Sequence, residues 1–274
     1  MSYKTLLVHL DSGARCPVRV ELAISLARRF DAYLVGVNAL TAVRIPGYVS
    51  AEAGDTFRQA QERTVREQAA ESEAAFRRAV GQAGLPQTEW RNAAADALDA
   101  VTLHARYADL VVIGQPDDAS GVDRGFAGRL VLGAGRPILV VPFAGEFRTL
   151  GKRVLVAWNA GPEATRAVTD AIPLLRQAEA VQVLAFNPSP GPHGAMPGTD
   201  IGLYLARHGV RIEVNEDYNP DIDVGNEILS RAADLGSDLI VMGAYGHSRL
   251  QQLIMGGATR TILESMTVPV LMSH

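Results

Sequence analysis

The residues of this chain best suited to bind a ligand are four glycines near its C-terminal end. Gly243 follows an apolar run, 239–242, Gly246 comes after two residues, and Gly256 and Gly257 follow nine residues further on. Glycine lets a backbone approach a ligand closely or adopt positive φ. A strand, a glycine turn and a helix N-terminus can hold phosphate, because free N–H groups and the helix dipole face the anion. The same glycines suit an ordinary tight turn, so their spacing alone leaves both interpretations open.

The other motifs argue against common enzyme classes. The segment 145–152 resembles a P-loop, but its glycine spacing is one residue too long and Arg153 takes the Ser/Thr position. A G-x-G pair beginning at Gly133 lacks the third glycine of a dinucleotide fingerprint. The sequence has no G-x-S-x-G elbow and no histidine pair at metal-ligand spacing. We therefore predict no catalytic residue and no metal site, and of six histidines only His247 lies in the glycine loop.

Composition predicts a soluble cytoplasmic protein. Of the 274 residues 47% are hydrophobic, which suits one large or two medium domains. The net charge of −4 argues against nucleic acid as a partner. No apolar run approaches the roughly 18 residues of a membrane span, and the N-terminus lacks a signal-peptide pattern. The single cysteine, Cys16, fits a reducing compartment and is interpreted as a small buried helix residue.

Apolar runs alternate with helical patterns throughout, which predicts a parallel sheet covered on both faces. Strands are expected at 4–11, 32–37, 87–91, 110–113, 138–141, 152–159, 181–186, 210–215, 237–243 and 267–273. Helices are expected at 18–30, 56–83, 95–105, 164–176, 201–208 and 224–235.

The pattern occurs twice. KRVLVAWN (152–159) matches KTLLVHLD (4–11), and SDLIVMG (237–243) matches ADLVVIG (108–114). TVPVLMS (267–273) likewise matches GRPILVV (135–141). Matched landmarks in one order indicate a tandem duplication with its join near 143–151.

The spacing Gly243-x2-Gly246-x9-Gly256, the strand before it and the TVPVL sequence after it resemble the universal stress protein family. KRVLVAWNAGPEATRAV resembles that family's first strand and helix. The resemblance covers both halves and implies two domains, 1–145 with a degenerate motif and 150–274 with the glycine motif retained. It implies an α/β fold, Rossmann-like and similar to adenine nucleotide alpha hydrolases. Each domain would have an open, mostly parallel five-stranded sheet with helices on both faces, and would commonly hold ATP or AMP at the carboxyl ends of its strands.

The resemblance also implies which residues of the second domain contact the nucleotide. They lie at strand ends, in the glycine loop and in the first turn of the last helix: Ala157, Trp158, Asn159, Phe186, Met242, Gly243, Gly246, His247, Gly256, Gly257, Ala258 and Thr259.

Two of these positions depart from the family pattern. Asn159 stands where the family usually has Asp, and Gly257 where it usually has Ser or Thr. Each loss is worth about 1 kcal/mol, together about thirtyfold in affinity. Trp158 and Phe186 could stack on adenine, fill the pocket or pack at strand ends, and the sequence does not decide among these.

The first half departs further from the motif. Asp117, Asp118 and Asp123 place negative charge where phosphate would lie, while Asp11 retains the acid that ends the first strand. We expect this half to bind nucleotide much more weakly or not at all, and to serve as a structural partner.

The resulting prediction is a stress-response protein that binds ATP or AMP, optionally with Mg²⁺, and acts as a sensor or regulator. Its enzyme activity would be slow ATP hydrolysis at most. The alternative is an interaction or scaffold protein whose two sites have both decayed and which binds no nucleotide. An enzyme of the ATP-pyrophosphatase or electron-transfer flavoprotein type is a weaker third hypothesis, because no substrate domain is recognisable.

The last strands of the two copies, 138–141 and 268–272, are apolar and would be sheet edges, which invite pairing. The resemblance implies that they pair within one chain as an internal pseudo-dimer, and a further homodimer is a second option.

Overall fold

The computed structural model describes residues 2–40, 51–116, 122–186, 198–217, 221–246 and 257–274, and for 51–58 and 61 it describes the backbone alone. The elements of the first half are β1 Thr5–Leu10, α1 Cys16–Phe30, β2 Tyr33–Ala39, α2 Ala51–Gln82, β3 Thr88–Ala93, α3 Ala97–Ala105, β4 Leu110–Gly114, α4 Phe126–Gly133 and β5 Ile138–Val141. The second half contains β6 Arg153–Trp158, α5 Pro162–Leu175, β7 Ala180–Phe186, α6 Thr199–Arg207, β8 Ile212–Asp217, α7 Val224–Asp234, β9 Leu239–Gly243, α9 Ala258–Ser265 and β10 Val270–Ser273.

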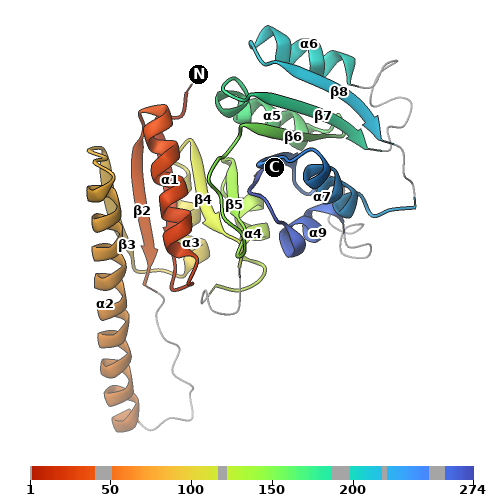
Figure 1. Ribbon diagram of the computed structural model, residues 1–274. Coiled ribbons are helices and arrows are strands. Elements are labelled where there is room, and N and C mark those ends of the chain that lie inside the picture. The colour runs from red at the N-terminus through yellow and green to blue at the C-terminus, as the bar shows by residue number, and fades with distance from the viewer. Residues whose placement is uncertain (1, 41–50, 117–121, 187–197, 218–220, 247–256) are drawn as a thin grey trace.

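All ten of these strands form one sheet in the order β3-β2-β1-β4-β5-β10-β9-β6-β7-β8 (Figure 1). Within each half all strand pairs are parallel. The second half has the same strand order as the first, read in the opposite direction across the sheet. The mostly parallel α/β fold with two five-stranded repeats is therefore confirmed. Between the halves β5 and β10 pair antiparallel, with Leu139 opposite Leu271, so the expected pairing of the last strands is present.

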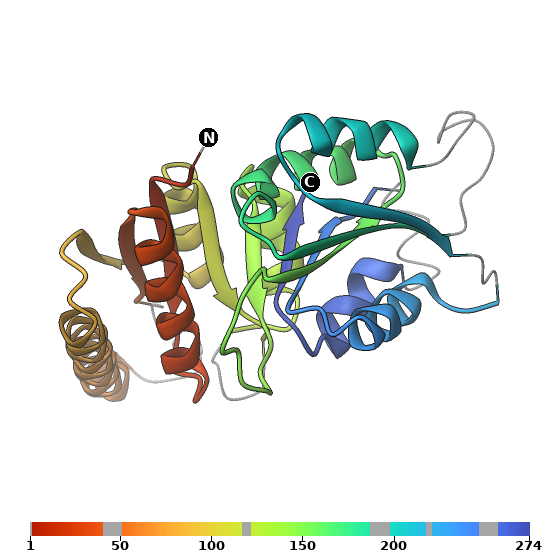
Figure 2. The ribbon, with the colours of Figure 1, turned by 45° about the horizontal axis from the view of Figure 1, so that its top comes forward.

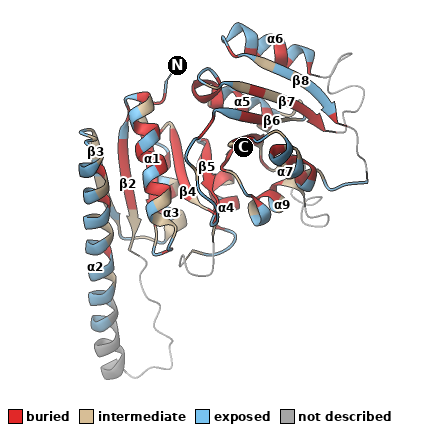
Figure 3. Cartoon of the chain, viewed as in Figure 1, coloured by how far each residue is buried: buried red, intermediate tan, exposed pale blue. Residues whose placement is uncertain are grey.

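Helices cover both faces of the sheet because its strands are apolar on both sides. One hydrophobic cluster lies under α1, α5 and α6, and the other lies under α3, α4, α7 and α9. Figure 2 shows helices on both sides of the strands, and Figure 3 shows the central strands as almost wholly buried. The lower part of α2 projects beyond the sheet in Figure 1, and residues 62–68 of this helix are mostly exposed, which fits their charged sequence.

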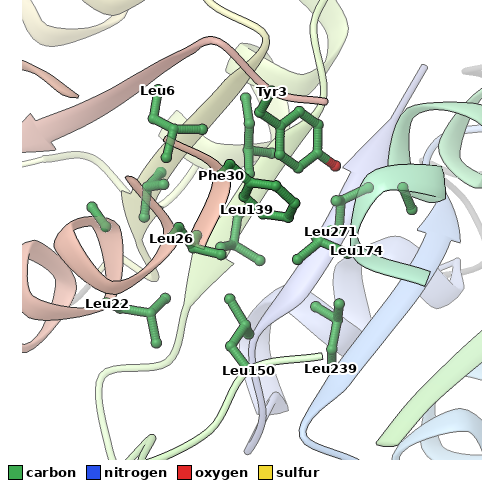
Figure 4. Packing of buried hydrophobic residues seen from close by; sticks show 14 of the residues in the cluster. Tyr3, Leu6, Leu22, Leu26, Phe30, Leu139, Leu150, Leu174, Leu239 and Leu271 are labelled. Carbon is green, nitrogen blue, oxygen red and sulfur yellow. The ribbon is translucent and has the colours of Figure 1, made fainter. Parts of the chain in front are cut away.

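The first cluster runs without interruption across the seam between the halves (Figure 4). Leu26 and Phe30 of α1 lie on the same side of the sheet as Leu174 of α5. The Tyr3 hydroxyl crosses the seam and donates a hydrogen bond to the Asp170 carbonyl oxygen at 2.6 Å. The two halves therefore share one core as well as one sheet.

The main difference from expectation is α4, which the sequence analysis did not anticipate. Its sequence FAGRLVLG is short and has two glycines, so its helical pattern is weak. Gly128 has a packing reason, because a Cβ there would collide with the Tyr245 hydroxyl from the second half. Cys16 begins α1 and is half-buried rather than fully buried. In the described parts of the chain, no helix has the length and apolarity to cross a membrane.

Candidate functional site

The sequence-predicted site lies at the carboxyl edge of the sheet in the second half, where β6 and β9 run side by side. Ala157 of β6 pairs with Met242 of β9, so Asn159 and Gly243 leave the sheet close together. From this point α5 crosses to one face of the sheet and α9 to the other. In open parallel sheets, ligands commonly bind at the strand ends where the crossovers change direction in this way, and we call this place the crevice.

The first glycine of the motif is held in close packing by α5. A Cβ on Gly243 would lie 2.6 Å from the Glu163 carbonyl carbon and would also collide with the Ala164 nitrogen. Only a residue without a side chain fits there, because the first turn of α5 rests on the end of β9. The protein therefore needs this glycine whether or not a ligand is bound.

The second glycine, Gly246, has side chains as its nearest neighbours, whereas Gly243 is packed against the backbone of α5. Gly246 is exposed, and a Cβ there would lie 3.0 Å from Glu163 Oε2 and 3.7 Å from Asn159 Nδ2. The residue before it, Tyr245, has a φ of 59°, which brings the loop back toward α9. Partial burial raises the pKa of the Tyr245 phenol, so this hydroxyl stays neutral near pH 7.

Asn159 is exposed and turns the chain into α5. Its Oδ1 accepts a hydrogen bond from the Gly161 N–H at 3.0 Å, and Ala160 between them has a φ of 57°. This Asx turn leaves the Nδ2 donor side toward Gly246. The position thus keeps a polar group at the crevice but carries no charge.

The N-terminus of α9 forms the other side of the crevice. Gly257 is its N-cap and provides no side-chain cap. The buried Thr259 accepts a hydrogen bond at its Oγ1 from the Tyr245 N–H at 3.2 Å, so this hydroxyl already holds the glycine loop to the helix. The N–H groups in the first turn of a helix, here including that of Ala258, have no partner within the helix and can donate to an anion.

The structure separates the two aromatic candidates. Phe186 is 9% exposed and packs with Met242 and Ala157 in the cluster under α7 and α9. Trp158 is half-buried and packs against the cluster under α1, α5 and α6, on the opposite face of the sheet. Trp158 is in register with Ala185 of β7, and side chains alternate along a strand, so the next residue, Phe186, points to the other face and the two rings do not line one wall. His247 and Gly256 lie outside the described residues.

The equivalent edge of the first half is filled by a buried arginine that the sequence analysis did not single out. Arg19 of α1 forms an ion pair with Asp11, Nη2 to Oδ1 at 2.9 Å, with the two side chains 3% and 8% exposed. Its Nε also donates to the His9 carbonyl oxygen at 2.8 Å. A Cβ on Gly114 would collide with Arg19 Nη1, so the arginine occupies the space that this glycine leaves open.

A signal for this arginine was present in the sequence. Arg19 falls among the apolar positions of α1 that repeat at helical spacing, and a charge on a core-facing stripe requires a partner.

The acidic residues expected to repel phosphate have a different role where they are described. Asp123 accepts from the Gly125 N–H at 2.5 Å and pairs with Arg129, while Asp117 and Asp118 lie outside the described residues.

A cavity of about 170 Å³ lies beside this ion pair, at the carboxyl ends of β1 and β2. Its lining includes His9, Asp11 and Asn38. Ligand pockets usually measure about 300 to 1,000 Å³, so this cavity is small for a nucleotide. Burial, reinforced by the charge of Arg19, lowers the pKa of His9 to about 4, so the imidazole is neutral near pH 7.

No cluster of three or more His, Cys, Asp or Glu side chains that could hold a metal is found among the residues that the structure describes.

Comparison with known proteins finds similarity to universal stress proteins. Residues 220–274 match the model of the universal stress protein family. The chain is 25% identical over 172 residues to universal stress protein Slr1230 of Synechocystis sp.. That alignment spans 60% of this chain and 57% of the relative, so it covers little more than half of the Synechocystis protein.

The fold is also that of a solved universal stress protein from Archaeoglobus fulgidus. The two structures have a TM-score of 0.75 at 14% sequence identity, covering 98% of this chain and 95% of the other. At this identity the likeness shows the fold alone. The resemblance expected from the glycine motif and the duplication is confirmed by these matches together.

Proposed function

From the premise that this chain has the sequence signature and the fold of a universal stress protein, we propose that its second half binds an adenine nucleotide. The ligand would be ATP or AMP, optionally with Mg²⁺, in the crevice between β6, β9 and the N-terminus of α9. The protein would act in the cytoplasm as a nucleotide-dependent sensor or regulator, with slow hydrolysis as the upper limit of its chemistry.

The observation that carries this proposal is the switch point at which α5 and α9 leave the sheet on opposite faces. In the first half the equivalent space beside Gly114 holds the Arg19 guanidinium. In the second half the matching position on α5 is Ala167, a fully buried core residue that places no charge at this edge of the sheet. The exposed Gly246 borders that crevice without a side chain of its own.

The surrounding groups suit the parts of a nucleotide. The N–H groups at the start of α9 can donate to phosphate oxygens, and the helix dipole favours the negative charge. Met242 and Phe186 supply apolar surface on the face of the sheet that α9 covers. Asn159 offers hydrogen bonds without charge, so we expect modest affinity.

Isothermal titration calorimetry with ATP and with AMP tests the proposal on wild type, Gly246→Asp and a control. The new carboxylate would lie beside Glu163, where it takes up space at the crevice and adds negative charge close to an anionic ligand, so we expect binding to weaken about tenfold or more. Gly81→Asp is the matched control, because Gly81 is exposed and a Cβ there meets nothing within 4 Å. Equal binding by wild type and Gly246→Asp, or no binding by wild type at millimolar ligand, would refute the proposal.

A scaffold function is the second candidate. It is favoured by the first half, where the Arg19–Asp11 pair fills the edge and leaves a small cavity. If wild type binds neither nucleotide, the scaffold hypothesis becomes the better account of the second half too. Sedimentation equilibrium of the full chain would separately test the expected further homodimer.

A further inference from the structure

Glu163 is the side chain of the crevice whose bonding is incomplete. It is the second residue of α5, and its Oε2 atom is inaccessible to solvent yet has no hydrogen-bond partner in the described structure. This oxygen lies 3.0 Å from the position of a Cβ on Gly246 and 3.3 Å from that of a Cβ on Gly161. The unpaired oxygen therefore lies directly beside the exposed glycine.

The chemistry of a carboxylate limits what can fill this position. An ionised carboxylate only accepts hydrogen bonds, and a buried acceptor without a donor is costly. The N-terminus of α5 stabilises negative charge on Glu163. Phosphate oxygens are also acceptors and anionic, so they are repelled from this position, whereas hydroxyl groups can donate to it.

We propose that Glu163 is a specificity-determining residue that accepts hydrogen bonds from the sugar hydroxyls of the nucleotide. The inference rests on the proposed nucleotide site and orients the ligand in it. The sugar edge lies against Glu163 and Gly246, and the phosphates lie toward the N-terminus of α9. Glu163 thereby supplies the negative charge that Asn159, with its Oδ1 bonded to the Gly161 N–H, does not carry.

The first half lacks this arrangement. The position that matches Glu163 is Arg15, whose Nη2 donates to the Gly145 carbonyl oxygen. The acid is therefore particular to the second half, the one with the exposed glycine at its crevice.

The test compares adenosine with 2′,3′-dideoxyadenosine by calorimetry, on wild type and Glu163→Gln. Wild type should prefer adenosine by about tenfold or more, because hydrogen bonds to a charged acceptor are strong. Glu163→Gln should reduce that preference to about threefold or less. The ratio of ATP to adenosine affinity should rise in the same variant, because a repelling charge has been removed. A loss of structure alone would not raise this ratio.

Two further variants complete the experiment. Glu179→Gln removes an exposed carboxylate paired with Lys152 and should behave as wild type. Glu163→Asp keeps the charge and should retain most of the discrimination between the two nucleosides. It replaces Glu163→Gln in the test if that variant folds poorly. If wild type binds ATP or AMP but binds the two nucleosides with equal affinity, this inference is overturned and the proposed function stands. Full discrimination in Glu163→Gln would have the same consequence. If wild type binds no nucleoside or nucleotide, both fail.

Discussion

Replacing Arg19 by Met is the perturbation that most directly tests how the first half is built. The guanidinium and the Asp11 carboxylate are almost fully buried, with atoms 2.9 Å apart. Removing one partner of a buried ion pair leaves an uncompensated charge and costs about 3 to 5 kcal/mol. The variant also loses the hydrogen bond from Arg19 Nε to the His9 carbonyl oxygen, worth about 1 kcal/mol. We therefore expect Arg19→Met to lower the free energy of unfolding by at least about 3 kcal/mol.

The double variant Arg19→Met/Asp11→Asn should be less unstable than the sum of the single variants. Asp11 Oδ1 accepts from the Gly13 N–H at 3.0 Å, and Asn can keep this bond, as Asn159 does in the second half. The double variant contains neither charge, so no charge is left unpaired. We expect a coupling energy of about 2 kcal/mol or more between the two positions.

Urea unfolding followed by circular dichroism measures all four proteins of this cycle. A cycle between Arg148 and Glu146 is the control, because this ion pair is 3.2 Å long but its side chains are 89% and 80% exposed. Its coupling should stay below about 1 kcal/mol. Additive effects of the Arg19 and Asp11 substitutions would show that the buried pair does not organise this edge of the sheet.

The remaining predictions concern pH, the glycines and the seam. The pKa of His9 falls from 6.5 to about 4 on folding, so below pH 6.5 the unfolded chain takes up the proton first. Stability should fall by up to about 3 kcal/mol between pH 6.5 and 4, and His9→Gln should flatten that part of the unfolding profile. Gly243→Ala should lower the melting temperature because its Cβ meets α5, whereas Gly246→Ala should leave it nearly unchanged and affect only nucleotide affinity. An unchanged melting temperature for Gly243→Ala would contradict the packing argument. Leu271→Asp puts an unpaired charge into the seam and should cost more than about 3 kcal/mol in urea unfolding. Leu203→Asp, at a position 51% exposed, should cost less than about 1 kcal/mol.

Much of the fold could be predicted from the sequence. Strands of a parallel sheet are buried on both faces and therefore occur as short apolar runs, which repeat at 4–11 and 152–159. The apolar last strands also indicated the pairing that joins β5 to β10. The helix α4 was missed, because its two glycines weaken the local pattern and its position is stabilised by packing against the second half.

The sequence by itself determined the duplication, the sheet, and the glycine edge as the place for a site. Only the tertiary structure decided what each half does with that edge. Arg19 fills it in the first half, and Glu163 faces Gly246 across 83 positions of sequence in the second. The physical reason is that strand patterns are local, whereas the partner of a buried charge is set by how a helix packs onto the end of a distant strand.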